Sequence, residues 1–236
     1  YFIFVAPDGT YAQDDPNLQE AWVRYKNAQL SDTHMQCLVT GGADEPIALL
    51  HPKIKGVRDT QSAGANLVSF NAAAYESYGL SASINAPVSE YAAFAYATAL
   101  NYLLSQPAHN AYLANSNIVY WAEDANPNYS DFFSVMLSPQ EDQSALLNSI
   151  MKKVTQGLPI AAEGLNEDTP FYVLGLAPNA ARISVRFFLR DTFGNMLQNI
   201  AAHYARLEIA KAPYERDYLT PYWLLLETVH PMSKDS

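Results

Sequence analysis

A first cluster of positive charge lies between residues 51 and 58, a segment that contains no acid. Its basic members are Lys53, Lys55 and Arg58. Gln61 and Ser62 follow and can hydrogen-bond to phosphates or base edges. Gly56 and Gly64 flank them, and glycines allow a backbone to approach a ligand closely. These residue types predict a nucleic-acid-binding loop, and the alternative is an ordinary solvated loop.

A second acid-free segment, residues 171–190, carries the other cluster. Its basic members are Arg182, Arg186 and Arg190. Strict alternation in a strand predicts two faces, one with Ile183, Val185, Phe187 and Leu189 and one with Ser184 and the three arginines. Guanidinium groups bind phosphates and carboxylates in the same bidentate geometry. The arginine face therefore predicts contact with nucleic acid, and the alternatives are carboxylates on neighbouring strands or on a partner protein.

The distribution of charge decides which classes of nucleic-acid binder are possible. Six of the 14 basic residues fall in these two segments, which leaves eight basic and 24 acidic residues elsewhere. The formal net charge is −10, so a uniformly basic nucleic-acid binder is excluded. Phosphates would be steered to the two local positive zones of a negative body.

Catalytic patterns are weak by comparison. The sequence has no GxSxG, P-loop, HExxH or CxxC motif. Glu123 and Asp124 follow an apolar run, where a metal-dependent nuclease could place acids, but no lysine or third carboxylate has a useful spacing. His34 lies three residues before Cys37, which opens an apolar run and is expected to be buried. The sequence therefore predicts no enzyme activity, no metal site and no cofactor.

Composition predicts a folded α+β protein. The chain has 236 residues, of which 49% are apolar and 16% charged, enough for one large domain or two small ones. Its apolar and aromatic content excludes disorder, and a single cysteine cannot form an internal disulfide. The stretch from Ala86 to Leu104 contains Glu90 and predicts a buried helix rather than a membrane span. The ends of the sequence are those expected of a piece of a longer protein.

In the first half, short apolar runs predict strands over residues 1–5, 37–40, 47–50 and 67–70. Asp15 before Pro16 predicts a capped helix that carries Leu18, Trp22, Val23 and Tyr25 toward a core. Residues 51–66 have no clean period and predict a loop. The helix over residues 87–104 has almost no charge, so we expect burial on most of its faces.

In the second half, strands are predicted over residues 117–121, 171–176 and 182–190, the last two joined as a hairpin through residues 177–179. Helices are predicted after Ser138, whose capping box includes Glu141, to Gly157, after Thr192, and from Pro221 through Leu226. This order suggests a ferredoxin-like unit that lacks its fourth strand. We expect two α+β lobes, residues 1–130 with the basic loop and residues 131–236 with the arginine strand.

Longer strings of sequence point to a known family. They are CLVTGG from Cys37, IALLHPKIKGVR from Ile47, LVSFN from Leu67, YESYG from Tyr75, NAPVSEYAAFAY from Asn85, VYWAED from Val119 and FYVLGLAPNAARISVRFF from Phe171. Together they resemble the large subunit of the type I-C CRISPR surveillance complex, Cascade. The resemblance spans residues 37–200 in near-continuous blocks. Members of that family are roughly twice this length or more, so this chain would be a middle portion.

The resemblance implies a non-catalytic role in an RNA-guided antiviral complex. Such a subunit helps to recognise the protospacer-adjacent motif, opens the duplex and contacts the displaced strand, while the guide RNA reads sequence by base pairing. The implied partners are the other Cascade protein subunits, guide RNA and target DNA, in the cytoplasm and without a membrane. The alternative is an architectural module that docks on partner subunits without touching nucleic acid. The resemblance assigns no residue, so the site residues rest on the charge map alone.

Overall fold

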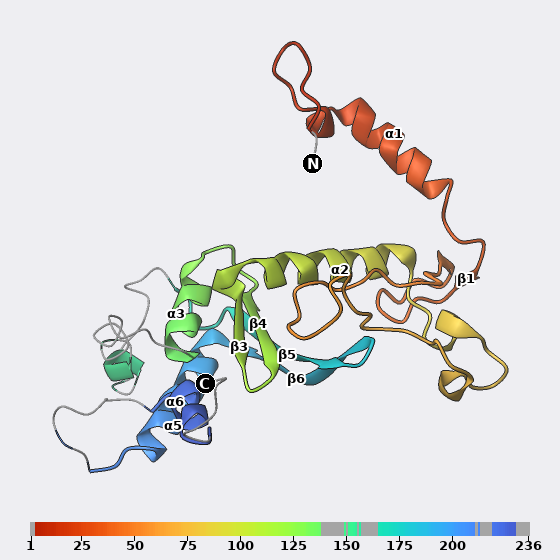
Figure 1. The fold of residues 1–236 in the computed structure, drawn as a ribbon. Coiled ribbons are helices and arrows are strands. Elements are labelled where there is room, and N and C mark those ends of the chain that lie inside the picture. The colour runs from red at the N-terminus through yellow and green to blue at the C-terminus, as the bar shows by residue number, and fades with distance from the viewer. Residues whose placement is uncertain are drawn as a thin grey trace. The chain divides into compact units, whose positions relative to one another are not determined.

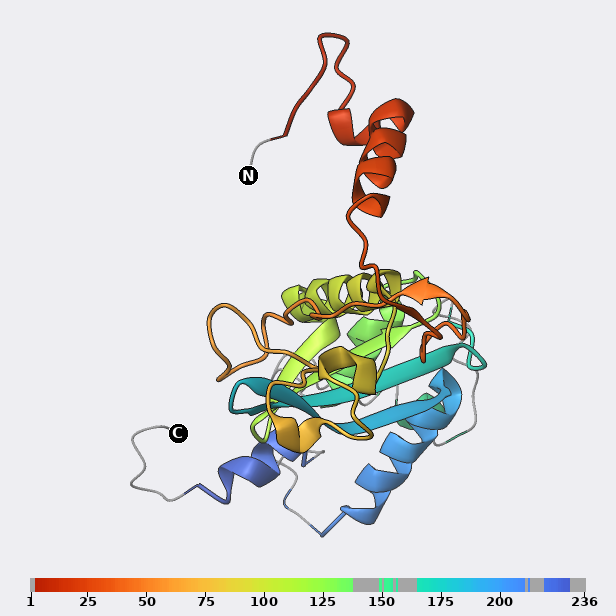
Figure 2. The same cartoon turned by 90° about the vertical axis from the view of Figure 1, so that its right-hand side faces the viewer.

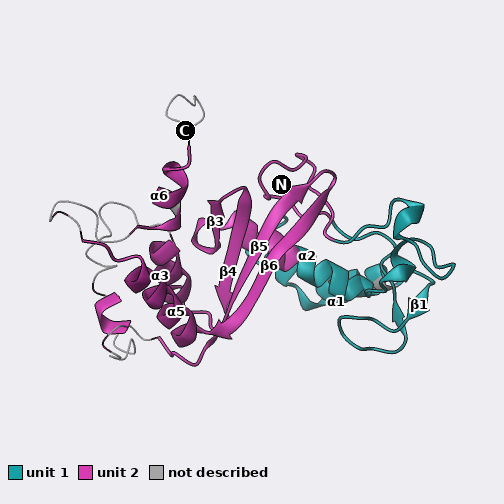
Figure 3. Cartoon of the chain, turned by 90° about the horizontal axis from the view of Figure 1, so that it is seen from below, with its two compact units in different colours: residues 1–52, 68–97 teal, residues 53–67, 98–236 magenta. Residues whose placement is uncertain are grey.

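The computed structural model describes residues 3–137, 149, 151–154, 156, 165–210, 212 and 219–229. The chain forms two compact units (Figure 3). Unit 1 comprises residues 1–52 and 68–97, and unit 2 comprises residues 53–67 and 98–236. These bounds differ from those of the two lobes predicted from the sequence. Most of the basic loop belongs to the same unit as the arginine strand.

Unit 1 contains few regular elements. They are the 3-10 helices Ala12–Asp14, Ala73–Tyr75 and Ala82–Asn85, helix α1 (Pro16–Asn27), strands β1 (His34–Met35) and β2 (Glu45–Pro46), and the first half of helix α2 (Glu90–Ser105) (Figure 1). The two strands pair antiparallel. Cys37 is buried as predicted, in a small core with Ala48, Val88, Ala92 and Ala93. This core holds the segments before and after the basic loop.

Helix α1 confirms one prediction and contradicts another. The Asp15 side chain accepts hydrogen bonds from the backbone N–H groups of Asn17 and Leu18, as expected of an N-cap before Pro16. The apolar side chains predicted to face a core are instead 52–62% exposed, namely Leu18, Trp22, Val23 and Tyr25. An apolar stripe shows that one face of a helix favours burial, but not which surface covers it.

The four short strands predicted in the first half are wrong. Of residues 3–5, only Val5 forms an isolated bridge, to Tyr11, and residues 38–40 form a turn. Ile47 forms an isolated bridge to Ser89, and residues 67–70 are bends and irregular chain. A strand needs a partner backbone along its length, and a run of four apolar residues satisfies burial equally well without one.

Helix α2 was predicted within one to three residues at each end, but its burial was not. Ala92, Ala93, Ala97, Leu100 and Leu104 are buried. Tyr91, Phe94 and Tyr102 are 61–75% exposed, so the prediction of burial on most faces is wrong. Among the described residues, no helix is long and apolar enough to cross a membrane.

Unit 2 is built on a four-stranded antiparallel sheet. Its strands are β3 (Asn110–Leu113), β4 (Ser116–Ala122), β5 (Pro170–Asn179) and β6 (Arg182–Thr192), preceded by a 3-10 helix, Pro107–His109. The predicted strands over residues 117–121, 171–176 and 182–190 are confirmed, and so is the hairpin, although β5 runs on to Asn179. The α+β class is therefore confirmed.

The sheet does not have ferredoxin-like topology. Its spatial order β3-β4-β5-β6 follows the chain, and each neighbouring pair is antiparallel. A ferredoxin-like unit would contain split βαβ crossovers. The missing fourth strand is β3, which precedes β4 in a tight hairpin turned at Ala114 and Asn115, both with positive φ.

Helices α3 (Asn128–Leu137) and α5 (Phe193–Arg206) cover one face of the sheet, and α5 lies along it in Figure 2. Tyr120 and Phe171 from the sheet pack with rings from α3 and α5 in an aromatic core. The predicted cap of α5 is confirmed, because Thr192 accepts a hydrogen bond from the Asn195 N–H. Helix α6 (Pro221–Leu226) is also confirmed. The sequence missed α3, and the capping box at Ser138 lies outside the described residues.

Candidate nucleic-acid interface

The basic loop is irregular, as predicted, but it is closed and anchored. Ile54 and Ala65 form an antiparallel bridge in which each N–H donates to the other residue's carbonyl at 2.9 Å. Both side chains are buried, and so is Val57. The segment between them is therefore a folded loop with an apolar base, and its polar side chains lie on the outside.

The two glycines of the loop serve this fold rather than the approach of a ligand. Gly56 and Gly64 have φ values of +89° and +86°, which side chains with a Cβ rarely adopt. A Cβ on Gly64 would lie 2.6 Å from the Ile54 carbonyl oxygen, and one on Gly56 would lie 3.3 Å from the Leu104 side chain. Glycine is thus required by the closure of the loop and by its packing on α2.

Two asparagine side chains form hydrogen bonds with the backbone of the three basic residues. The Asn101 side chain on α2 accepts a hydrogen bond from the Lys55 N–H at 2.7 Å and donates one to the Lys53 carbonyl at 3.1 Å. The Asn117 side chain on β4 accepts one from the Arg58 N–H at 2.8 Å. The backbone at all three cations is therefore bound to α2 or β4. Sequence reasoning missed both asparagines.

The side chains predicted to bind nucleic acid are exposed at the outer surface of the loop. They are Lys53, Lys55, Arg58, Gln61 and Ser62. The Arg58 guanidinium lies 4.4 Å from the centre of the Tyr112 ring, and the Tyr112 hydroxyl donates to the Asp59 carboxylate at 3.3 Å. Desolvation, followed by the nearby Asp59 charge, raises the pKa of Tyr112, which stays a neutral donor. The ring thereby positions Arg58.

The structure joins the loop to the arginine strand. Asn66 forms a parallel bridge to Arg182, and its carbonyl accepts a hydrogen bond from the Ile183 N–H at 3.0 Å. The end of the basic loop, residues 51–66, thus adjoins the start of β6. Arg186 and Arg190 lie farther along the same strand, about 13 Å and about 26 Å from Arg182 at the usual rise per residue.

A β-bulge overturns the predicted alternation of β6. Gly175 pairs with Phe187 and Leu176 pairs with Val185, so Arg186 is an extra residue without a partner on β5. A bulge of one residue shifts the alternation of everything beyond it. Arg190 therefore shares a face with Ile183 and Val185, and the prediction that all three arginines line one face is wrong.

Two arginines of β6, Arg186 in the bulge and Arg190 beyond it, have no carboxylate partners in the described part of the chain. Arg186 and Arg190 are exposed, and neither lies within 4.0 Å of a described acidic group. The same holds for Lys53, Lys55 and Arg58 in the loop. For these five residues, pairing with described carboxylates does not account for their charge, which is available to a phosphate or to a partner protein.

Glu123 and Asp124 both take part in local hydrogen bonds. The Tyr172 hydroxyl donates a hydrogen bond to the Glu123 carboxylate, and the Asn126 N–H donates to Asp124 at 2.8 Å. The bond to Glu123, followed by desolvation, raises the pKa of Tyr172. Within the described residues, no group of three histidines, cysteines or acids could hold a metal ion. The absence of enzyme activity stays a prediction.

Comparison with known proteins places this chain in a family. The family model described as CRISPR-associated protein (Cas_Csd1) matches residues 2–236. The chain belongs to the Cas_Csd1 family. A search of curated proteins finds no match. Membership confirms the resemblance to a CRISPR-associated protein, and it implies that this Csd1-family chain works with other Cas proteins.

Proposed function

We propose that this Csd1-family chain is a nucleic-acid-contacting module of a type I-C Cascade complex, acting in the cytoplasm in antiviral defence. Its partners are the other Cascade protein subunits, guide RNA and target DNA. The observation that supports this proposal most directly is the anchored loop. It holds Lys53, Lys55 and Arg58 exposed and without described ion pairs, on a chain whose net charge is −10.

The loop has the parts needed to bind a short stretch of duplex. Its three cations would contact phosphates, which position a protein on DNA without reading sequence. Gln61 and Ser62 are exposed beside them and can hydrogen-bond to base edges, as recognition of a protospacer-adjacent motif requires. The guide RNA would read the remaining sequence by base pairing. Negative charge elsewhere on the chain would confine DNA to this surface.

A specific observation also favours the architectural alternative. Apolar side chains are exposed on α1 and along β6, where Val185, Phe187, Phe188 and Leu189 are 38–55% exposed. Strand β6 is also an edge of the sheet among the described strands. Exposed apolar surface on an edge strand is typical of a protein interface. Arg186 lies in this strand, so a substitution at Arg186 can distinguish nucleic-acid contact from docking on a partner subunit.

We expect the substitution Arg186→Glu to leave the subunit assembled in the complex and to weaken its binding of target DNA in a salt-dependent way. The Arg186 side chain is exposed, and the residue has no cross-strand partner on β5, so the change should not unfold the sheet. Binding is measured as a function of salt, and assembly by co-purification. Arg206→Glu, at another exposed arginine of unit 2, is the matched control. Release of a folded Arg186→Glu subunit from an intact complex would favour the architectural function instead.

The non-catalytic role predicts that the assembled complex, without other proteins, does not cleave DNA in Mg²⁺ or Mn²⁺. Glu123 is engaged by Tyr172, and among the described residues Glu123 and Asp124 have no third histidine, cysteine or acid with which to hold a metal ion. The measurement is cleavage of labelled duplex and single-stranded DNA. Cleavage that disappears in a Glu123→Ala variant would show that the chain is a nuclease.

A further inference from the structure

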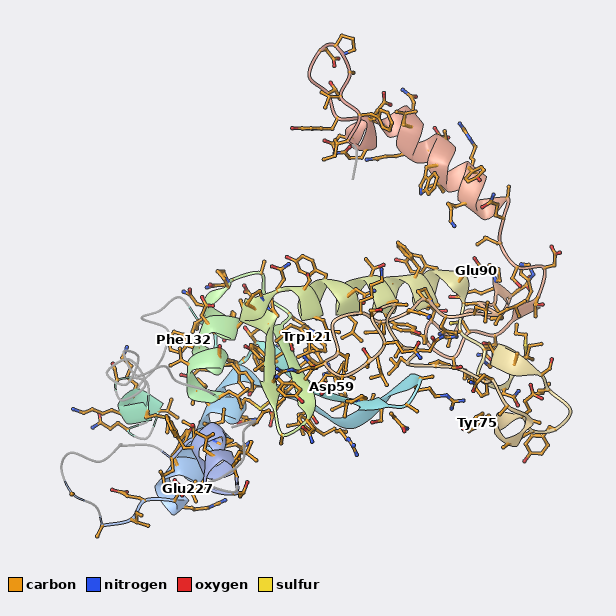
Figure 4. The ribbon with its side chains drawn as sticks, in the orientation of Figure 1. Asp59, Tyr75, Glu90, Trp121, Phe132 and Glu227 are labelled. Carbon is orange, nitrogen blue, oxygen red and sulfur yellow. The ribbon has the colours of Figure 1, made fainter. Side chains whose placement is uncertain are left out.

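Three aromatic side chains form a cluster on the face of the unit 2 sheet opposite the helices. Trp121 on β4, Tyr172 on β5 and Arg190 on β6 are directly paired across the three strands. Phe188 lies two residues from Arg190 and shares its face. Figure 4 labels Trp121 within the sheet. The cluster exists only because the bulge at Arg186 moves Phe188 and Arg190 to this face.

The rings of this aromatic cluster are close and nearly parallel. Trp121 and Tyr172 have centroids 5.1 Å apart and planes 9° apart. Phe188 lies 6.1 Å from Tyr172 and 6.5 Å from Trp121, with planes inclined by 20° and 30°. The Glu123 carboxylate accepts the Tyr172 hydroxyl proton in a hydrogen bond and so fixes the central ring. The cluster is a preformed stack.

Part of this stack reaches solvent. Phe188 is 55% exposed, and Trp121 and Tyr172 are partly exposed. At the other end of the same sheet face, Val119, Leu176 and Ile183 are buried, where Asn66 of the basic loop bridges to β6. The face therefore changes from a covered end at Ile183 to an open aromatic end at Arg190.

Charge around the cluster differs from one strand to the next. Glu123 stands just beyond the end of β4, whereas Arg190 on the edge strand β6 has its guanidinium 5.7 Å from the centre of the Tyr172 ring. Neither Arg190 nor Arg186 has an acidic partner among the residues described. A polyanion whose flat groups stacked on the rings would thus place its phosphates toward β6 and away from Glu123.

We propose that the cluster of Trp121, Tyr172, Phe188 and Arg190 binds unpaired bases of a single-stranded nucleic acid. Aromatic rings stack on the face of any base, which makes such a site tolerant of sequence. Bases inside a duplex are stacked on one another and cannot reach it. The inference rests on the proposed function, which it deepens by assigning contact with an unpaired strand to a second surface, distinct from the basic loop.

The test compares two strands of equal length and charge on the assembled complex. One is oligothymidine that cannot pair with the guide RNA, and the other is an abasic strand. We expect the wild-type complex to prefer oligothymidine. Phe188→Ala and Trp121→Ala should each lower the affinity for oligothymidine about tenfold and leave that for the abasic strand unchanged. Tyr102→Ala, at an exposed aromatic residue of α2, is the control and should change neither.

Trp121→Phe guards against a structural effect, because it keeps a stacking ring and should retain most of the affinity that Trp121→Ala loses. Equal loss for both strands, or an equal affinity of the wild type for both, would overturn the inference while leaving nucleic-acid binding intact. Loss of the Phe188→Ala subunit from the complex would overturn it by showing a protein-docking surface. The proposed function would instead be refuted if the wild-type complex bound target duplex no better than the variant in which alanine replaces Lys53, Lys55 and Arg58.

Discussion

Replacing Lys53, Lys55 and Arg58 together with alanine is expected to lower the affinity of the assembled complex for target duplex about hundredfold at about 0.15 M salt. Each phosphate contact releases counterions and contributes about −0.9 to the slope of log K against log salt, so three contacts contribute about −2.7. The loss should shrink as the salt concentration rises, because the missing interaction is electrostatic.

The matched control replaces Arg24, Lys26 and Arg206 with alanine, since these residues are also exposed and the net charge changes equally. It should leave the slope nearly unchanged. Affinity is measured by titration of labelled duplex over a range of salt concentrations. An unaltered slope in the loop variant would show that these three cations contact no phosphate and that the loop is an ordinary solvated one.

Gly64→Val should reduce duplex affinity almost as far as the triple alanine variant although it removes no charge. A Cβ there would lie 2.6 Å from the Ile54 carbonyl oxygen, and a β-branched residue is strongly disfavoured at a φ of +86°. The bridge between Ile54 and Ala65 would open, and the cations would lose the geometry in which Asn101 and Asn117 hold them. The core of unit 2 should remain folded, since the loop lies outside the helix-covered face.

Gly9→Val is the matched control for this variant, because Gly9 has a φ of +87° but open space around its Cβ position. It introduces the same backbone strain in unit 1 and should leave duplex affinity unchanged. Circular dichroism checks that both variants stay folded. Normal affinity in a folded Gly64→Val complex would show that the loop does not need its closed form to bind DNA.

Local signals in the sequence were sufficient for several elements of the fold. Asp15 before Pro16 and Thr192 before an amphipathic run mark helix starts, because a cap and its helix lie within a few residues of each other. The hairpin of β5 and β6 follows from two long apolar strands with a short connection. The four short apolar runs carried no such signal, since burial alone does not require a partner strand.

The positive clusters and the family resemblance were also readable from the sequence. Charge is a property of residue type, so a segment with basic residues and no acid can be recognised without knowing the fold. What the sequence could not show is how such segments are held. Asn101 and Asn117 bond to the loop from positions 46 and 59 residues away, and an asparagine carries no local sign of so distant a partner.

Only the tertiary structure decided which residues share a surface. Asn66 meets Arg182 at the edge of the sheet, so two separate basic segments become neighbours. The bulge at Arg186 comes from the pairing of β6 with β5, where Gly175 and Leu176 oppose Phe187 and Val185. Alternation can be counted along one strand, but its register is set by the neighbouring strand. For that reason the three arginines do not share one face of β6, as the alternation predicted. Arg190 instead lies on the same face as Phe188 and Tyr172, beside the aromatic cluster.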